Sequence, residues 1–132
     1  MPITGTGEET RDFTYVGDLI DGILRAGYYD SAIGQEFNLA SGKETKIIDL
    51  ANMINKAVKN KAGIKFAQKR KWDTKSRLLA SVDRARKLIG YEPKIEFKEG
   101  LMNTIKWFKD NWKNIGKSAS FGPGISSAVR DK

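Results

Sequence analysis

The sequence predicts an α/β domain built from about four helices and a few short strands. Apolar residues recur every three or four positions at 47–58 and again at 101–112, which is the spacing of one helix face. Between the helical stretches lie short apolar runs bounded by glycine, serine or lysine, which are typical of brief strands. At 132 residues, the chain is one domain or part of one.

Composition excludes several classes of protein. The chain has no cysteine and no histidine, so it carries no disulfide framework and lacks the commonest general base and metal ligand at neutral pH. No apolar run approaches the roughly 20 residues needed to span a bilayer, and no N-terminal stretch has the pattern of a secretory signal. We therefore expect a soluble, cytoplasmic protein without bound metal.

Positive charge is concentrated in one part of the chain. The formal net charge is +8, and residues 56–77 contain nine lysines and arginines but only one acidic residue, Asp73. Such a stretch is compatible with a solvated basic face, with a phosphate site inside that face, or with a nucleic-acid surface. Nucleic acid is the least favoured partner, because Phe66 and Trp72 are the only aromatic residues in the stretch.

The first elements lead into a helix. Gly5-Thr6-Gly7 is not interpreted as a phosphate loop, because no third glycine or helix follows and Glu8-Glu9 would repel phosphate. A strand or turn is expected to lead into Arg11, and the alternation of Phe13 and Tyr15 continues it. The first helix is predicted from Asp18, as its N-cap, to Ala26.

The middle of the chain predicts strand, helix and strand. Gln35–Ala40 has the composition of a short strand that ends at Ser41-Gly42. The second helix is predicted to begin after an N-cap at Thr45 or Lys46 and to end between residues 60 and 63. A brief strand is expected at Ile64–Ala67.

The last third predicts two more helices after a basic loop at Lys69–Leu79. Ser81 is expected to cap the third helix and Gly90 to end it, with a short extended piece at residues 95–97. The fourth helix carries an apolar stripe that is predicted to be core: Leu101, Ile105, Phe108 and Trp112. Composition then changes, so we expect a domain at 1–115 and a flexible tail at 116–132.

Four stretches resemble one enzyme family in the right order. Residues 11–18 fit R-D-F-x-Y-V-x-D, and the others lie at 37–51, 70–73 and 80–101. Over Ile3–Trp112 the chain resembles the C-terminal, substrate-binding part of extended short-chain dehydrogenase/reductases. These are the NAD-dependent nucleotide-sugar epimerases and dehydratases, such as UDP-glucose 4-epimerase.

The resemblance also shows which family features are missing. The family's Rossmann half carries G-x-x-G-x-x-G and a catalytic Tyr-x-x-x-Lys pair, and neither pattern occurs in this sequence. The resemblance therefore implies a C-terminal lobe with the Rossmann nucleotide-binding half absent, not catalytic alone. It implies no cofactor in this chain and NAD in the full-length parent.

The resemblance assigns a ligand and four residues. The ligand is a nucleoside diphosphate sugar, whose phosphates would be contacted by Arg11 and Arg70, while Asp73 would accept from a sugar or ribose hydroxyl. Arg77 is a reserve candidate. Two alternatives stay open: a surface ion pair for Arg11 with a neighbouring acidic residue, and a local salt bridge between Arg70 and Asp73.

The resemblance also raises the question of partners. In the family, the segment like Glu36–Leu39 adds an edge strand to the nucleotide-binding sheet, so here it must pair locally, pair with another chain or stay loose. We expect the missing Rossmann half as a partner, or self-association through the Glu36–Leu39 strand. The competing functions are a small basic nucleic-acid-binding module and an assembly domain that pairs with a separate cofactor-binding chain.

Overall fold

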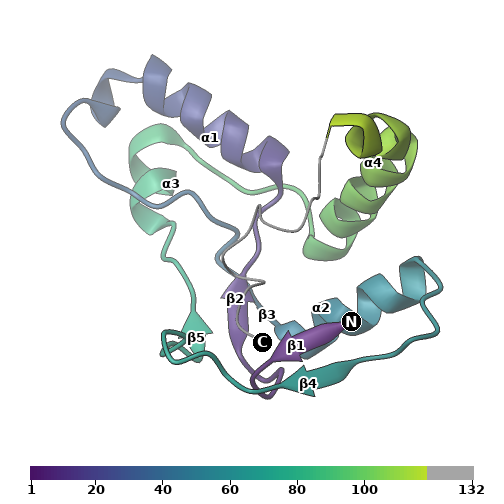
Figure 1. The fold of residues 1–132 in the computed structure, drawn as a ribbon. Coiled ribbons are helices and arrows are strands. Elements are labelled where there is room, and N and C mark those ends of the chain that lie inside the picture. The colour runs from purple at the N-terminus through teal and green to yellow at the C-terminus, as the bar shows by residue number, and fades with distance from the viewer. Residues whose placement is uncertain (119–132) are drawn as a thin grey trace.

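Four α-helices and five short strands make up the described part of the chain, residues 1–118 of a computed structural model (Figure 1). The predicted fold class is confirmed. The elements in order are β1 (Pro2–Thr4), β2 (Thr10–Asp12), α1 (Val16–Tyr28), the 3-10 turn η1 (Asp30–Ala32), β3 (Glu44–Lys46), α2 (Ile47–Ala57), β4 (Lys65–Ala67), β5 (Arg77–Leu78), α3 (Asp83–Ile89) and α4 (Phe97–Ser118).

The strands form two small sheets that join distant parts of the chain. β1 pairs in parallel with β4, from Pro2 opposite Lys65 to Thr4 opposite Ala67. β2 lies between β3 and β5, antiparallel to the first and parallel to the second. Each strand has only two or three residues, so the sheets join pairs of segments locally and do not form a separate layer.

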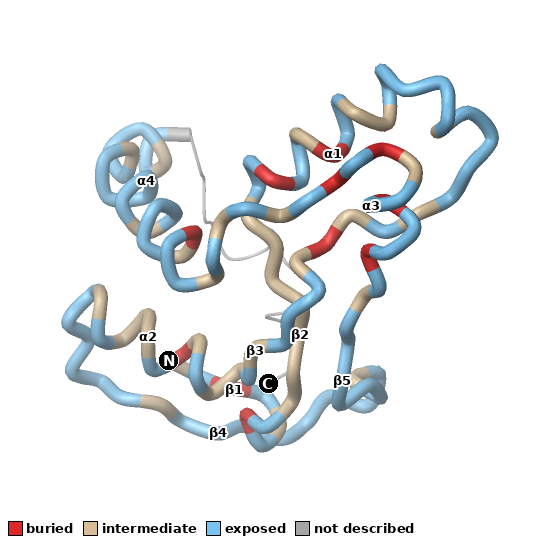
Figure 2. The backbone as a smooth tube through the Cα atoms, turned by 180° about the vertical axis from the view of Figure 1, so that it is seen from behind, coloured by how far each residue is buried: buried red, intermediate tan, exposed pale blue. Residues whose placement is uncertain are grey.

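The main core lies between α1, α3 and the segment that follows η1. Its buried residues are Ala40, Val82, Ala85, Ile89 and Tyr91. Figure 2 shows these buried positions as red segments around α3 and beneath α1. The Tyr91 side chain is fully buried, and its hydroxyl donates to the Ala40 carbonyl oxygen at 3.0 Å. One aromatic residue therefore holds three segments together.

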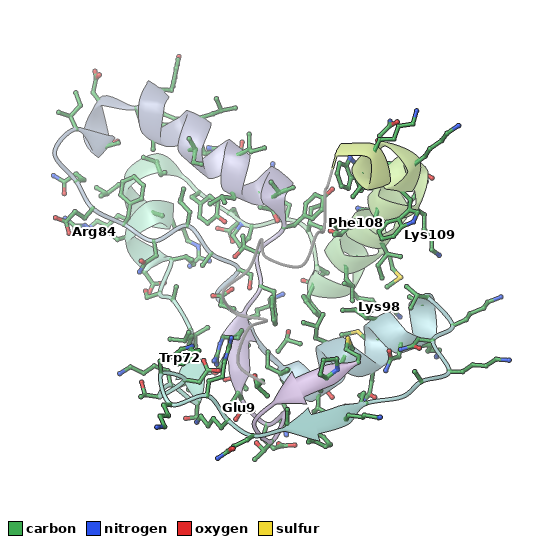
Figure 3. All side chains as sticks on the ribbon, viewed as in Figure 1. Glu9, Trp72, Arg84, Lys98, Phe108 and Lys109 are labelled. Atoms are coloured by element: carbon green, nitrogen blue, oxygen red, sulfur yellow. The ribbon has the colours of Figure 1, made fainter. Side chains whose placement is uncertain are left out.

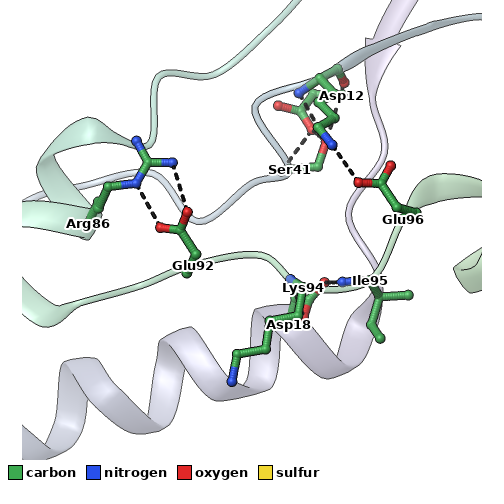
Figure 4. Close-up of polar contacts among 9 residues, drawn as sticks. Asp12, Asp18, Ser41, Arg86, Glu92, Lys94, Ile95 and Glu96 are labelled. Carbon is green, nitrogen blue, oxygen red and sulfur yellow. Dashed lines mark hydrogen bonds and ion pairs between the residues drawn. The ribbon is translucent and has the colours of Figure 1, made fainter.

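Helix α1 begins earlier than predicted, and Asp18 does not cap it. Tyr15 is the N-cap residue, and Asp18 lies inside the first turn, where it is buried. Its carboxylate accepts the backbone N–H groups of Lys94 at 3.1 Å and Ile95 at 3.0 Å (Figure 4). The prediction of a cap was wrong because the carboxylate pairs with a segment remote in sequence instead of its own helix.

The strand predicted at Gln35–Ala40 is wrong. These residues form no strand, and in the described part of the chain no backbone hydrogen bond ties residues 36–39 to another segment. Neither sheet extends to this segment. Self-association through the Glu36–Leu39 segment stays a prediction.

Smaller corrections concern helix ends. The extended piece expected at residues 95–97 is wrong, because Phe97 opens α4. Helix α3 starts at Asp83 with Val82 as its N-cap, one residue after the predicted Ser81, whose hydroxyl accepts the Asp83 N–H at 3.4 Å. Gly90 ends α3 in the left-handed conformation (φ 61°), as predicted.

The second and fourth helices were placed well, but one face was misjudged. Lys46 caps α2 and β4 forms at Lys65–Ala67, as expected, although α2 ends at Ala57. On α4, Phe108 and Trp112 remain 46% and 64% exposed, so the prediction of a core stripe was wrong there. Helix α4 continues to Ser118, and the rest of the predicted tail lies outside the described residues.

In the part of the chain that the structure describes, none of the helices combines the length and the apolar character needed to cross a bilayer.

Candidate functional site

A cleft of about 340 Å³ lies between β1, α2 and the basic loop before β5. One wall is apolar and comes from α2; the other carries charged groups from β2 and the loop. The lining residues include three of the four predicted site residues, Arg11, Arg70 and Asp73, together with Glu9, Lys69, Lys75, Ile3, Ile47, Leu50, Ala51 and Ile54. Its volume falls at the lower end of the range for small-molecule sites.

Arg11 is held at the cleft without a carboxylate partner. It sits on β2, and its guanidinium donates to the carbonyl oxygens of Thr10 at 2.7 Å and Lys75 at 3.2 Å. Among residues 1–118 it makes no ion pair, so the open alternative of a salt bridge with a neighbouring acidic residue is wrong. Its guanidinium is oriented by two neutral carbonyl groups.

The acidic neighbours of Arg11 are engaged elsewhere. Glu8 pairs with Lys46 at 2.7 Å. Asp12 accepts the backbone N–H groups of Ser41 at 2.9 Å and Gly42 at 3.0 Å, as Figure 4 illustrates for Ser41. Sequence reasoning missed this role of Asp12, which ties β2 to the turn before β3 and so fixes the strand that carries Arg11.

Arg70 and Asp73 form the local salt bridge that sequence analysis left open. The guanidinium lies 2.9 Å from the carboxylate and 5.8 Å from the centre of the Trp72 ring. Trp72 itself is 68% exposed. The Nε–H group of Arg70 donates to one carboxylate oxygen of Asp73 at 2.9 Å.

Arg77 lies outside the cleft. It belongs to β5 and pairs with Glu44 of β3 at 2.8 Å across the three-stranded sheet. Thr10 of β2 donates to the same carboxylate at 2.6 Å. The structure therefore places Arg77 in a contact that joins all three strands, away from the other three predicted residues.

Two hydrogen bonds lower the pKa of the Glu44 carboxyl from 4.5 to about 2. The bond from Arg77 has the larger effect and the bond from Thr10 the smaller one. A folded-state pKa below the unfolded value contributes stability that is present above the unfolded pKa and is lost as pH falls toward the folded one. We predict that the difference in unfolding free energy between wild type and Glu44→Gln shrinks as pH drops from about 4.5 to about 2, in urea titrations at each pH. A matched Glu36→Gln variant, which loses an exposed carboxylate with no ion pair in the described residues, serves as the control. A Glu44→Gln difference that stays constant over this range would contradict the prediction.

The glycine-rich turn binds one of the chain's own carboxylates. Gly5 and Gly7 adopt φ values of 93° and 83°, which allow the turn to fold back on Glu9. The backbone N–H groups of Thr6 and Gly7 donate to that carboxylate at 3.4 Å and 2.9 Å. Hydrogen bonds from the backbone N–H of Glu9 itself, and from those of Thr6 and Gly7, lower the pKa of the Glu9 carboxyl, whereas burial raises it. This turn is therefore occupied by an internal anion.

The N-terminus of α2 is also occupied. The first N–H groups of the helix, on Ile47 and Ile48, donate to the carbonyl oxygens of Glu9 and Gly7 at 2.9 Å each. A helix N-terminus binds anions only through free N–H groups. The positively charged side chains that line the cleft are Arg11, Lys69, Arg70 and Lys75.

Two lysines complete the charged wall. Lys69 and Lys75 line the cleft beside Arg70, and both belong to the basic stretch at residues 56–77. Their spacing in that stretch could not separate them from the other lysines. Figure 3 shows Glu9 and Trp72 at the end of the molecule where this wall lies.

Comparison with known proteins identifies the family. The GDP-mannose 4,6 dehydratase family matches residues 1–104. The chain belongs to this family. An epimerase from Methanothermobacter thermautotrophicus is similar in structure, with a TM-score of 0.87 and 48% identity over 89% of this chain and 35% of that one. UDP-glucose 4-epimerase of Mycolicibacterium smegmatis is 33% identical over 82% of this chain and 34% of its own length.

The GDP-mannose 4,6 dehydratase family groups NAD-dependent nucleotide-sugar epimerases and dehydratases. A UDP-glucuronic acid 4-epimerase from Bacillus cereus, solved with UDP-glucuronic acid and NAD, aligns with a TM-score of 0.75 and 27% identity, over 83% of this chain and 35% of that one. The present chain spans about a third of the length of such relatives.

The patterns that the family uses for NAD do not occur in this sequence. The sequence has neither the glycine pattern nor the tyrosine–lysine pair that the family uses for the cofactor, and the glycine-rich turn that is present holds Glu9. Within residues 1–118, no group of three or more acidic side chains is arranged to hold a metal ion.

Proposed function

We propose that this chain is the substrate-binding portion of an NAD-dependent nucleotide-sugar epimerase or dehydratase, and that its cleft binds a nucleoside diphosphate sugar. The observation that carries the proposal is the guanidinium of Arg11, which is held by two carbonyl oxygens, without an ion pair in the described residues, in the cleft that Arg70 also lines. Four cationic side chains, Arg11, Lys69, Arg70 and Lys75, face two carboxylates, Glu9 and Asp73, in the lining, and a diphosphate would balance the excess positive charge.

Each lining group has a role in this proposal. Arg11 and Arg70 donate to the phosphate oxygens, with Lys69 and Lys75 adding positive charge around them. Asp73, already fixed by Arg70, accepts a hydrogen bond from a sugar or ribose hydroxyl. A charge-assisted hydrogen bond of this kind contributes about 1.5–3 kcal/mol. The apolar wall from α2 covers the less polar parts of the ligand.

The chain's own part in the reaction is to bind the nucleoside diphosphate sugar and to orient it. The family's acid/base pair, Tyr-x-x-x-Lys, is absent from the sequence, so no residue here moves the reacting proton. NAD, bound by the cofactor-binding portion of the fold, supplies hydride transfer in the whole enzyme. The substrate's diphosphate, anchored by Arg11 and Arg70, fixes where the sugar meets that portion.

The experiment is a titration of the full chain with UDP-glucose, by calorimetry and by amide chemical shifts. We expect saturation, with shifts concentrated at the cleft, and at least a tenfold loss of affinity in Arg11→Ala, which corresponds to about 1.4 kcal/mol. The matched control is Arg84→Ala, which also removes one positive charge. Arg84 is an exposed residue of α3 and donates to Gln35 at 2.7 Å, away from the cleft (Figure 3).

Three outcomes contradict the proposal. Equal losses in Arg11→Ala and Arg84→Ala would mean that net charge alone attracts the ligand. No binding at millimolar UDP-glucose would mean that the isolated chain has no diphosphate site. Tight binding of single-stranded DNA that collapses with added salt, without saturable binding of UDP-glucose, would instead favour the nucleic-acid alternative.

A further inference from the structure

Trp72 lies on the basic loop with most of its side chain in solvent. The residue is 68% exposed, and Figure 3 labels it on the loop before β5. Trp107, another exposed tryptophan, packs edge-on against Phe108. In the described residues Trp72 pairs with no aromatic ring, and the Arg70 guanidinium lies 5.8 Å from its ring centre. One cation therefore lies over the indole, and much of the remaining ring surface is in contact with solvent.

The backbone of the loop fixes where the indole stands. Two hydrogen bonds close the turn, from the Asp73 N–H to the Arg70 carbonyl oxygen at 3.0 Å and from the Thr74 N–H to the Trp72 carbonyl oxygen at 2.9 Å. Just beyond this turn, the Arg11 guanidinium binds the loop to β2. The indole is therefore positioned relative to both arginines of the cleft before any ligand arrives, which lowers the cost of binding.

The cleft is small for the ligand proposed above. Its volume of about 340 Å³ is at the lower end of the range for small-molecule sites. A nucleoside diphosphate sugar carries a base, a ribose, two phosphates and a hexose, so part of it lies outside. Arg70 and Asp73 line the cleft, whereas Trp72, between them in sequence, does not. A group that leaves the cleft past Arg70 therefore meets the indole.

The indole and the guanidinium together match the chemistry of a nucleotide. Nucleobases stack on aromatic side chains through their flat faces, whatever the base. In a nucleotide the base is separated from its first phosphate only by the ribose, and here the aromatic ring lies close to a cation that lines the diphosphate cleft. Arg70 can therefore donate to a phosphate while Trp72 stacks on the base of the same molecule.

The base is a better occupant of the indole than the hexose. The reacting sugar has to reach an acid/base pair and a nicotinamide, and the sequence contains neither the Tyr-x-x-x-Lys pair nor the glycine pattern for NAD. The hexose must therefore point away from this chain's own loop. The base takes no part in the reaction, so it is the end of the ligand that this loop can hold.

A nucleic-acid strand is a poorer match than a single nucleotide. A strand needs a series of aromatic platforms for successive bases. The other aromatic residue of the basic stretch is Phe66, which belongs to β4 and packs against Gly7. Trp72 thus offers one platform, which is what one nucleotide needs.

We propose that Trp72 is a ligand-binding residue of this site, and that its indole stacks on the base of the nucleoside diphosphate sugar at the margin of the cleft. This inference rests on the diphosphate site proposed above, because the phosphates bring the base to the loop. Arg70 then has three neighbours: the indole, the Asp73 carboxylate and a phosphate of the ligand.

The test compares UDP with inorganic pyrophosphate, which keeps the two phosphates and lacks the nucleoside, in calorimetric titrations of the full chain. Trp72→Ala should weaken UDP at least tenfold, which corresponds to about 1.4 kcal/mol, and leave pyrophosphate unchanged. Trp72→Phe keeps a ring and should lose less than about threefold for UDP. The uracil H5 and H6 signals should shift upfield on binding to the wild type and not on binding to Trp72→Ala, because only the wild type has the indole ring current. Trp107→Ala, which removes an exposed tryptophan from α4, is the matched control and should bind both ligands normally.

The outcomes separate this inference from the diphosphate site. If Trp72→Ala binds UDP as the wild type does while pyrophosphate binds, only the stacking role is overturned. Equal losses for UDP and pyrophosphate would mean that Trp72 only holds Arg70, and a loss for UDP-glucose without one for UDP would place the hexose on the indole; both overturn it. An equal loss for UDP in Trp107→Ala overturns it too. Absence of binding by either UDP or pyrophosphate overturns both proposals.

Discussion

Replacement of Tyr91 by alanine should lower the free energy of unfolding by about 3–5 kcal/mol, as is typical for a large aromatic residue removed from a core. The side chain is fully buried among Ala40, Ala85 and Ile89, and it packs against the backbone of Gly22. These contacts come from three separate segments, so a cavity here cannot collapse by moving one of them. Urea denaturation followed by circular dichroism measures the change.

Two further variants isolate the causes. Tyr91→Phe keeps the ring but removes the donor to the Ala40 carbonyl, so it should cost about 1–3 kcal/mol. Tyr28→Ala removes a tyrosine that is 81% exposed and should change stability by less than about 0.5 kcal/mol. Similar losses for Tyr91→Ala and Tyr28→Ala would mean that the core does not lie where the structure places it.

The second large effect is expected for Asp18→Asn, with a loss of about 3 kcal/mol. The carboxylate is buried and accepts two backbone N–H groups, from Lys94 and Ile95. An asparagine of the same shape offers one oxygen and turns an N–H donor toward the other, which leaves a buried donor unpaired.

The matched control for Asp18→Asn is Asp21→Asn on the same helix. Asp21 forms a partly exposed ion pair with Arg25, so its loss should cost less than about 1 kcal/mol. Thermal and urea unfolding of the two variants under the same conditions measure the difference. If both variants lose the same small amount, Asp18 does not anchor the segment before α4.

The sequence predicted those elements whose cause is local. The apolar spacing of α2 and the glycine that ends α3 are properties of neighbouring residues, and both were found. Asp18 shows the limit of such reasoning. An acidic residue at the start of a helix satisfies the pattern for a cap, but here its partners are Lys94 and Ile95, which no spacing along α1 reveals.

The strand predicted at Gln35–Ala40 failed for a related reason. Its composition is that of a strand, but a strand exists only when another segment offers its backbone, and the described chain offers none. The exposed aromatic residues of α4 have the same explanation, because periodicity indicates an apolar face without showing what covers it. Composition and periodicity therefore describe these segments correctly but cannot supply their partners.

The candidate site was predicted in part. The family pattern, and not composition, singled out Arg11, Arg70 and Asp73, and the fold brings all three to one cleft. The same pattern could not show that Arg77 pairs with Glu44 or that Glu9 lies in the cleft with its carboxylate bound by the glycine-rich turn. The ligand-binding roles of Arg11, Arg70 and Asp73 remain proposals, which the titration with UDP-glucose tests.

The parallel pairing of β1 with β4 and of β2 with β5 affects when this region can fold. The Met1 amine donates to the carbonyl oxygen of Gly63, and Arg11 donates to that of Lys75, contacts that span 62 and 64 residues. Contacts so distant in sequence form slowly and late. During synthesis on the ribosome, the cleft cannot close until the polypeptide has emerged through Leu78. The hydrogen bond from Arg11 to the Lys75 carbonyl oxygen therefore cannot form until many residues after Arg11 have been added.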